Sequence, residues 1–407
     1  MTGRYVVTGI GVTAPNGLGT ERFWSSTLAG RSGLGRITRF DPAPYPVTLA
    51  GEVRDFAVDD HLPRKITVQT DLMTHLALAA SEMALADAGI DPARQPEYEM
   101  AVMTANSSGG NEFGQREIQA LWSNGPRHVG AYQSIAWFYA ASTGQISIRH
   151  GMRGPCGVIA TEQAGGLDTV AQARRVLRGG TGVVLTGGTD ASLSPYGLVT
   201  QMPTGMLSRS ADPDRAYLPF DIEACGYVPG EGGAMLVMED EGAARARGAE
   251  RIYGEIAGYA ATFDPRPGSD RQPGLRRAIE GALTDARVTP EEVDVVFADA
   301  KGVQGADLRE SQALAEVFGP FGVPVTAPKT MTGRLYAGGA ALDLAAALLA
   351  VHHSVIPPTT NVARLAPGCD IDLVRDVPRE KSVRTALVLA RGHGGFNAAL
   401  VVRAVRD

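Results

Sequence analysis

The sequence predicts an α/β fold in which one or more sheets are covered by helices on both faces. Short runs of β-branched residues alternate with stretches of helical periodicity along most of the chain. These runs are almost continuously apolar, as in strands buried on both faces, and do not alternate apolar with polar residues. A charged, alanine-rich segment at 239–250 is followed by a second region of the same kind, so we expect a two-fold architecture.

The individual elements follow in chain order. The first strand is predicted in the N-terminal stretch MTGRYVVTGIGV. Six more runs with strand character lie at 100–107, 157–161, 182–188, 233–239, 293–300 and 385–392. Between the second and third of these, four apolar residues keep a helical spacing, with Arg174 as the one exception, and the pair Gly179–Gly180 ends the helix: Leu167, Val170, Ala171 and Leu177.

The length of 407 residues allows two domains or one large duplicated core. We predict halves at 1–250 and 251–407, with the segment 239–250 as the crossing helix between them. A helical insertion is expected at about 111–156, which holds two of the three tryptophans. Large aromatic side chains are usually buried, so we expect this aromatic cluster to belong to the core and not to an interface.

Composition excludes several classes of function. Hydrophobic residues make up 44% and charged residues 20%, which is typical of a folded globular protein. The net charge of -6 and the lack of a Lys/Arg-rich run argue against a nucleic-acid partner. The most apolar helical stretch, Ala340–Val351, contains Asp343 and is too short to span a bilayer. No membrane partner is expected.

The three cysteines are widely spaced and form no CxxC pair, so neither a disulfide framework nor a metal site is predicted. This pattern suits a reducing cytoplasm. We expect Cys156, Cys225 and Cys369 to be small packed side chains and not nucleophiles.

The stretch GVIATEQAGGLDTV (157–170) reads as a strand, a tight turn and a helix opened by glycines. Such a turn usually displays a nucleophile. Gly165 and Gly166 would allow close backbone approach and leave N–H groups free to bind an anionic oxygen. Acyl transfer there would need a Ser or Cys, however, and the amide of Gln163 cannot lose a proton near pH 7. From these residues alone, a glutamine without function in a polar turn is the simplest interpretation.

Four segments, in order along the chain, resemble motifs of the β-ketoacyl synthases of the thiolase-like superfamily. They are GVIATEQAGGLD (157–168), LPFDIEACGYVPGEGGAMLVME (218–239), VIPPTTNV with DIDLV (355–362 and 370–374) and GHGGFNAALVV (392–402). The resemblance implies a thiolase-like fold, that is, a duplicated αβαβα layered core with the helical insertion in its N-terminal half. It covers almost the whole chain.

The condensing enzymes of that family use a cysteine and two histidines. Matching their motifs to this chain places Gln163 at the cysteine, Lys301 at one histidine and Arg334 at the other. Condensation by this chain itself is therefore predicted to be disabled. The family lysine is retained as Lys329, and the resemblance suggests Asp307 and Glu310 as its carboxylate partners.

The glutamine at the turn and the insertion resemble the chain length factor, the second ketosynthase-like subunit of type II aromatic polyketide synthases. The resemblance implies a heterodimer with a catalytic ketosynthase and no cofactor. An acyl carrier protein would bring malonyl and polyketide chains on phosphopantetheine, and the polyketide would extend from the partner's cysteine into a tunnel along the shared interface. The tunnel positions carried over to this chain are Asn111, Gly114, Ile118, Tyr196 and Gly197.

Residues 111, 114 and 118 would share one face of a helix, which supports this assignment independently. Glycine inside a helix costs about 1 kcal/mol relative to alanine, so Gly114 needs a reason. Two explanations for this glycine remain open: it makes room for a polyketide chain, or it allows another helix to pack closely. If Gly114 and Ile118 leave room, the tunnel would be long.

Three hypotheses about function follow. In a non-condensing chain length factor, the amide of Gln163 would fill the oxyanion pocket, and the nearby cations of Lys301 and Arg334 would fix the filled site. Alternatively, the chain is a malonyl-acyl-carrier-protein decarboxylase that supplies an acetyl primer through Gln163, since decarboxylation needs only stabilisation of the enolate oxygen. Loading domains of that kind are expected to keep their histidines. An independent condensing enzyme is disfavoured by the missing cysteine and histidines.

Overall fold

The computed structural model describes residues 3–266 and 268–405. Its main element is a mixed sheet of twelve strands. The main strands of the first half are β1 (Tyr5–Ala14), β5 (Met100–Ala105), β6 (Cys156–Ile159), β7 (Val183–Ala191) and β8 (Glu231–Asp240). Those of the second half are β9 (Gly254–Phe263), β10 (Val295–Phe297), β11 (Pro324–Thr326), β15 (Thr385–Arg391) and β16 (Phe396–Arg403). Residues 1 and 2 of the predicted N-terminal strand lie outside the described residues.

The remaining strands are short. β2 (Gly17–Leu18) pairs with β1, and β13 (Asp372–Leu373) extends the sheet beyond β11. Two separate two-stranded sheets are formed by β3 (Leu34–Arg36) with β4 (Leu49–Gly51), and by β12 (Val355–Ile356) with β14 (Arg379–Glu380).

The order of the strands shows that the core is duplicated. The first half runs β6-β5-β7-β8-β1 across the sheet, and the second runs β11-β10-β15-β16-β9. Numbered within its own half, each set has the order 3-2-4-5-1, with the same pattern of parallel and antiparallel neighbours. The halves meet where β1 pairs with β9, at Val6↔Glu255 and Val7↔Gly254. The predicted duplicated α/β core is confirmed, and a division at residue 250 stays a prediction.

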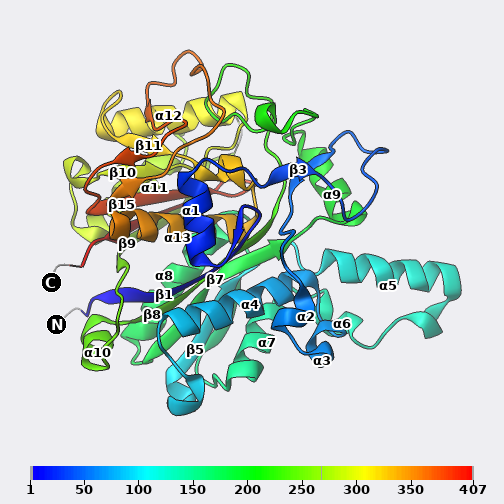
Figure 1. Ribbon diagram of the computed structural model, residues 1–407. Helices are drawn as coiled ribbons and strands as arrows, with labels where there is room; N and C mark the ends of the chain where they lie inside the picture. Colours follow the sequence, from blue (N-terminus) through cyan, green and yellow to red (C-terminus); the bar gives the residue numbers. More distant parts are fainter. Residues whose placement is uncertain (1–2, 267, 406–407) are drawn as a thin grey trace.

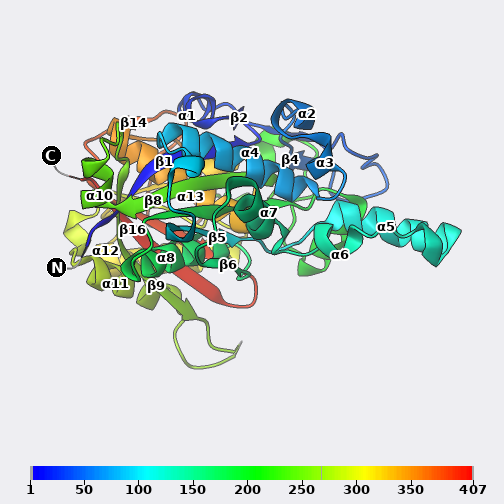
Figure 2. The same ribbon diagram turned by 90° about the horizontal axis from the view of Figure 1, so that it is seen from below.

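Helices form three layers around this sheet (Figures 1 and 2). The central layer holds α8 (Gly165–Arg178) and α13 (Ala337–His353), which follow equivalent strands of the two halves. One outer layer holds α4 (Leu72–Asp87) and α7 (Ala141–His150), and the other holds α11 (Leu275–Ala286) and α12 (Gln304–Phe318). The α4 and α11 helices each follow the first strand of their half, so the layers repeat as well.

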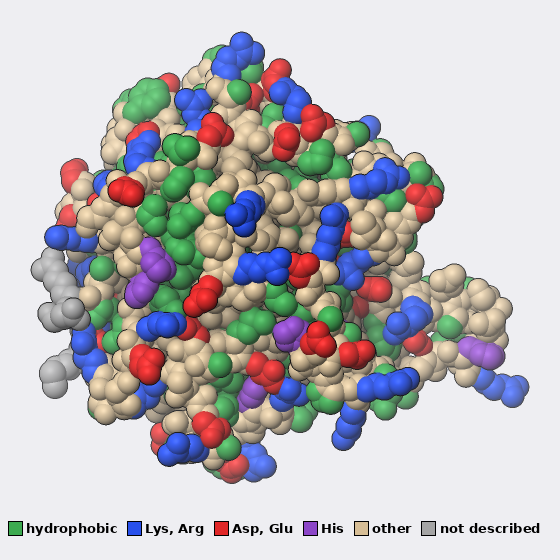
Figure 3. Space-filling view, in the orientation of Figure 1, with side chains coloured by type: hydrophobic (Ala, Val, Ile, Leu, Met, Phe, Trp, Pro, Cys, Tyr) green, Lys and Arg blue, Asp and Glu red, His purple; other side chains and the backbone are tan. Residues whose placement is uncertain are grey.

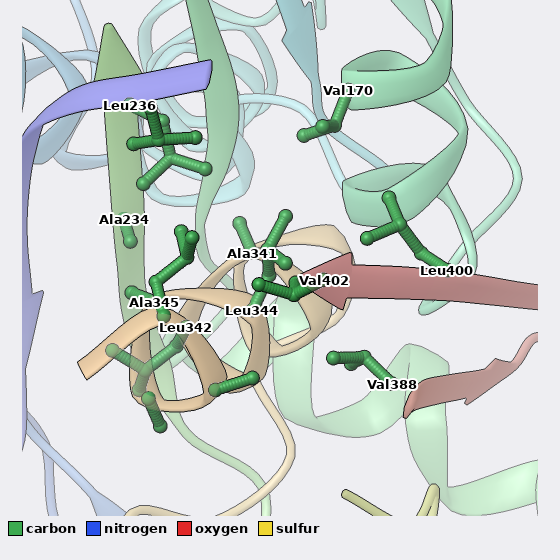
Figure 4. Packing of buried hydrophobic residues seen from close by; sticks show 14 of the residues in the cluster. Val170, Ala234, Leu236, Ala341, Leu342, Leu344, Ala345, Val388, Leu400 and Val402 are labelled. Carbon is green, nitrogen blue, oxygen red and sulfur yellow. The ribbon is translucent and has the colours of Figure 1, made fainter. Parts of the chain in front are cut away.

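The α13 helix is the centre of the main core. Every residue from Ala337 to Val351 is buried, and Figure 4 shows its apolar side chains among those of β8, β15, β16 and α8. This is the stretch that the sequence marks as most apolar. Within the described part of the chain, no helix is long and apolar enough to cross a membrane.

The other helices are short or lie at the surface. They are α1 (Thr20–Leu28), α2 (Val58–His61), α3 (Arg64–Thr67), α5 (Asn111–Asn124), α6 (Gln133–Ala136), α9 (Pro195–Gln201) and α10 (Glu241–Ala246). Single 3-10 turns are η1 (Pro92–Arg94), η2 (Glu97–Glu99), η3 (Pro126–His128), η4 (Met202–Thr204), η5 (Pro213–Arg215), η6 (Pro290–Glu292) and η7 (Pro328–Met331). The α10 helix lies between β8 and β9, where the crossing helix is predicted.

Residues 111–140, with α5, η3 and α6, form an arm that stands out from the body of the molecule (Figures 1 and 3). The carboxylate of Asp71 fixes its base, since one oxygen accepts the N–H of Phe113 at 2.8 Å and the other caps α4. The last part of the predicted insertion is not in the arm, because α7 packs against α4 in the outer layer.

The expectation that the aromatic cluster of the insertion is core is wrong. Trp122 is 82% exposed and Trp137 is 50% exposed, and the neighbouring Phe138 and Tyr139 are also exposed. The physical reason is the projection of the arm, which leaves these side chains with little protein around them. These residues have the composition of a hydrophobic core, but this chain by itself does not bury them.

Candidate functional site

The glycine-rich turn between β6 and α8 is built as a sharp elbow. Glu162 has a φ of 53°, a conformation that costs energy for a residue with a side chain. The N–H of Gly165 bonds to the carbonyl of Glu162 at 3.0 Å and closes the turn. A Cβ on Gly166 would lie 2.4 Å from the carbonyl oxygen of Ala337, so glycine is required for α8 and α13 to approach each other.

Gln163 is fully buried at this elbow. Its carboxamide lies against Gly339 in the first turn of α13, where an added Cβ would be 2.6 Å from Nε2. Neither Oε1 nor Nε2 has a hydrogen-bond partner among the described residues. The Gln163 side chain thus fills space between the two central helices, and Gly339 provides the room that it occupies.

We therefore expect Gly339→Ala to destabilise the protein by about 1 to 3 kcal/mol, because overpacking a filled site forces side chains out of their rotamers. In a Gln163→Ala background the same change should be neutral or stabilising, since alanine is the better helix former by about 1 kcal/mol. Chemical denaturation of the four variants of this cycle measures the coupling. Purely additive effects would contradict the contact.

The two residues at the predicted histidine positions differ in environment. Arg334 is buried and forms an ion pair with Asp299, with Nη2 and Oδ1 3.0 Å apart. Its guanidinium also donates to the carbonyl oxygens of Asp299 and Arg391. Lys301 is partly buried and makes no hydrogen bond or ion pair within the described chain. Burial lowers the pKa of Lys301, and the charge of Arg334 lowers it further.

Asp299 is the counter-ion of this cluster. Burial alone would raise the pKa of its carboxyl, but the positive charges of Arg334 and Lys329 hold that pKa well below its usual range. The Oδ1 atom also accepts the backbone N–H of Arg391 at 2.9 Å. The guanidinium of Arg334 donates to Asp299 and Arg391, and the Gln163 carboxamide has no hydrogen-bond partner among the described residues, so the expectation that this cation fixes the filled site is wrong.

The predicted partners of Lys329 are also wrong. Its Nζ lies 2.6 Å from Oδ2 of Asp343 on α13 and 3.0 Å from the carbonyl oxygen of Asp299. Asp307 and Glu310 instead accept backbone N–H groups, Asp307 from Phe220 and Gly302 and Glu310 from Asp299 and Ala300. Asp343 is the carboxylate in the apolar stretch 340–351, and a buried charge needs a partner. That sequence signal shows that Asp343 needs a buried partner but does not identify Lys329 as that partner.

The pKa of Asp343 is raised to about 6. Burial is the main cause, and the ion pair with Lys329 offsets only part of it. The pair therefore joins η7 to α13 without being exposed to the pocket, which is a structural role for the retained lysine.

A cavity of about 560 Å³ opens above the elbow. Its charged lining groups are Glu162, Lys301 and Arg334, and the remaining walls are mostly aromatic or apolar: Ala160, Pro203, Met206, Tyr227, Tyr336 and Phe396. Glu162 is held there by the backbone N–H of His393, at 2.8 Å. Gln163 is not among the residues that line this cavity. The cavity lining thus has cations but no cysteine.

The five predicted tunnel residues are placed on two neighbouring helices. Asn111, Gly114 and Ile118 lie on α5, and Tyr196 and Gly197 lie on α9. The helices are joined at their ends, where the N–H of Tyr196 donates to Gln115 at 2.7 Å. Ile118 and Tyr196 are 46% and 49% exposed, so this chain alone leaves one side of the group open.

The structure gives different explanations for the two glycines of this group. A Cβ on Gly114 would meet its nearest neighbours at 3.8 and 3.9 Å, in Gln133 and Trp137, which is ordinary contact. Close packing thus does not require glycine there. A Cβ on Gly197 would lie 2.5 Å from the carbonyl oxygen of Ser192, so at that position glycine is needed for packing.

The cysteines are only partly as expected. Cys369 is buried, and burial raises the pKa of its thiol to about 11. Cys156 and Cys225 are exposed, which corrects the prediction that all three are packed. Cys156 begins the edge strand β6, and Cys225 lies in a loop between β7 and β8.

Comparisons with known proteins agree with this architecture. The model of the β-ketoacyl synthase N-terminal domain matches residues 4–244, and that of the C-terminal domain matches residues 253–363. The chain is 62% identical to the tetracenomycin polyketide synthase ketoacyl synthase beta subunit of Streptomyces glaucescens over 399 residues, 98% of each chain. It is 56% identical to the actinorhodin polyketide putative beta-ketoacyl synthase 2 of Streptomyces coelicolor, again over 98% of each.

Solved structures give the same result. The ishigamide ketosynthase/chain length factor superposes with a TM-score of 0.89 at 29% identity, covering 99% of this chain and 100% of the other. A type II polyketide synthase acyl carrier protein in complex with its ketosynthase (AntDE:AntF) gives a TM-score of 0.88 at 27% identity, with the same coverage. The chain belongs to the β-ketoacyl synthase family, and within it to the chain length factors, the ketosynthase β subunits of type II polyketide synthases.

Proposed function

We propose that this chain pairs with a catalytic ketosynthase and, without condensing units itself, shapes the tunnel that fixes polyketide chain length. One observation carries the proposal: the position of the nucleophile is taken by a glutamine that is fully buried below the cavity and cannot touch a substrate there. Acyl transfer needs an accessible, ionisable nucleophile, so the growing chain must be attached to another subunit. An acyl carrier protein is the proposed source of the malonyl units.

Two exposed features of the surface suit that partner. Seven of the sixteen large hydrophobic side chains exposed in the described chain lie on the arm: Ile118, Trp122, Tyr132, Ile135, Trp137, Phe138 and Tyr139. Contiguous exposed apolar surface of this kind marks interaction sites. Next to it, β6 is an edge strand of the large sheet, with unpaired backbone groups on its outer side. Pairing along β6 and packing against the arm would cover both.

The proposed tunnel lies at this interface. Ile118 of this group and Trp122 are both exposed and lie four residues apart on α5, so a partner that covers the arm would also supply a wall for the group. Gly114 and Ile118 then leave the tunnel wide at the base of the arm. This assignment of Asn111, Gly114, Ile118, Tyr196 and Gly197 rests on the family resemblance together with their common placement.

Trp122→Asp should weaken the heterodimer at least tenfold. The indole is 82% exposed and stacks on no other ring of the described chain, so the substitution leaves the fold intact but places a charge in an apolar interface. Val377→Asp is the matched control, because Val377 is also an exposed apolar residue, at 69%, on the other half of the molecule. Analytical ultracentrifugation with the co-purified ketosynthase measures both. Equal effects of the two substitutions would remove the arm from the interface.

The proposed function is tested by expressing the chain with and without a catalytic ketosynthase and its carrier protein. We expect polyketide only from the combined set, with the covalent intermediate on the partner subunit by intact mass spectrometry. A ketide attached to this chain in isolation would overturn the proposal.

The decarboxylase alternative needs Gln163 to contact a malonyl thioester. Because that side chain is buried and absent from the cavity wall, we expect carbon dioxide release from malonyl carrier protein by the purified chain to equal the release by Gln163→Ala. A radiometric assay with labelled malonyl groups measures this. Loss of a clear activity on substitution would favour the decarboxylase.

A further inference from the structure

A second cavity, of about 590 Å³, lies between α11 and α12 on the C-terminal half. It is lined by four arginines and two glutamates: Arg276, Arg277, Arg309, Arg391, Glu280 and Glu316. The whole chain has a net charge of -6, so a lining with an excess of arginine runs against its overall balance. Nothing in the proposed tunnel or the elbow uses these side chains.

The two glutamates do not neutralise the charges of all four arginines. Both pair with the same residue, Arg276, whose Nε is 2.8 Å from Glu280 and whose Nη1 is 3.1 Å from Glu316. Arg277 and Arg309 are exposed and form no hydrogen bond or ion pair with any described residue. Two guanidinium groups at the rim therefore keep their charge and all of their donors.

Arg391 forms the inner end of the cavity. It is only 7% exposed, and Nη1 donates to the carbonyl oxygen of Ala306 at 2.9 Å. The buried carboxylates of Asp299 and Glu310 lie near enough to feel its charge, but no carboxylate in the described part of the chain forms an ion pair with it. A buried arginine that faces a cavity has its remaining donors available for a ligand.

We propose that this cavity is a binding site for a phosphate ester of a small organic molecule. The planar guanidinium matches phosphate oxygens in bidentate geometry, and a phosphate ester spreads its negative charge over non-bridging oxygens that several arginines can hold at once. The volume is within the usual range for small-molecule sites, so it accommodates an organic group together with the phosphate. The uncharged amides of Gln272 and Gln312 in the lining supply further hydrogen bonds.

The site is also connected to the elbow cavity through one strand end. Arg391 ends β15, and His393, two residues further on, lines the elbow cavity. The carbonyl oxygen of Arg391 accepts a hydrogen bond from Arg334 at 3.1 Å, and its N–H bonds to Asp299. A ligand held by the Arg391 side chain is thus next to the backbone that supports the buried ion pair.

Two sources can present this chemistry: the phosphopantetheine arm of a carrier protein and a free nucleotide such as coenzyme A. Isothermal titration calorimetry of the co-purified heterodimer with 4′-phosphopantetheine, coenzyme A and inorganic phosphate separates them. We expect both esters to bind more tightly than inorganic phosphate. Equal affinity for the two esters would assign the site to the pantetheine phosphate. Tighter binding of coenzyme A would assign the site to a nucleotide.

Arg277→Ala and Arg309→Ala should each weaken ester binding at least tenfold and reduce its dependence on salt. Arg94→Ala is the matched control, since Arg94 is an exposed arginine on the other half of the chain and should leave binding unchanged. The proposal is overturned if neither ester binds, if inorganic phosphate binds as tightly as they do, or if the two variants bind like the wild type. Heterodimer assembly and product length are read separately, so failure here leaves the proposed function standing.

Discussion

Replacing Gly114 by phenylalanine should shorten the released polyketide by at least one extender unit. Gly114 is buried near the base of α5, yet an added Cβ would meet nothing closer than 3.8 Å. A methyl group is therefore accommodated beside the helix, and we expect the larger benzyl group to occupy part of the proposed tunnel. Helix propensity favours the substitution, because glycine costs about 1 kcal/mol relative to alanine. Product mass after co-expression with the ketosynthase gives the result.

Two controls separate a tunnel effect from a folding effect. Gly114→Ala adds only the tolerated methyl group and should keep the product length. Gln119→Phe adds the same ring to an exposed position of the same helix and should also leave the product unchanged. If Gly114→Phe assembles with the partner and still yields the original product, Gly114 does not line the tunnel.

Replacing Asp299 by alanine should lower the free energy of unfolding by about 3 to 5 kcal/mol, the usual effect of removing one partner of a buried ion pair. Arg334 would then be left as a buried charge, since its remaining acceptors are two carbonyl oxygens. Arg215→Ala breaks an exposed pair with Glu223 and should change stability by less than about 1 kcal/mol. Urea denaturation compares the two variants.

The same pair predicts a dependence on pH. The pKa of Asp299 lies below its value in the unfolded chain, so its contribution to stability is present above about pH 4 and is lost as the pH falls through the folded pKa. The stability difference between wild type and Asp299→Asn should stay constant from pH 7 to about pH 4 and shrink as the pH is lowered further. Asparagine keeps an acceptor for the N–H of Arg391, so this variant is expected to fold. A difference that grows on acidification would contradict the assigned pKa direction.

Much of the candidate site could be predicted because its signals are local. The elbow depends on residues that are neighbours in the sequence, namely a strand followed by glycines. The structure confirms that turn, with Gln163 at its tip. The positions of Lys301 and Arg334 followed from motifs and both line the elbow cavity. The partner of Lys329 could not be predicted in the same way, because Asp343 reaches it only after α13 has been placed in the centre of the fold.

The arm shows the opposite case. Its aromatic residues have the composition of a core, and composition records only that a side chain prefers to leave water, not which molecule covers it. The direction of α5 is set by Asp71, which lies 42 residues before Phe113 and caps two helices at once. No local sequence pattern predicts a contact between residues so far apart in the chain.

For this protein, the sequence by itself determined the α/β class, the identity of the elbow and the loss of a nucleophile there, since each depends on residue type and on spacing within a single element. Only the tertiary structure decided that the Gln163 amide is sealed beneath Gly339, that Arg334 is neutralised by Asp299, and that the arm is exposed. Those outcomes depend on which distant segments meet, and burial, charge pairing and solvent exposure are properties of the packed layers rather than of any stretch of chain.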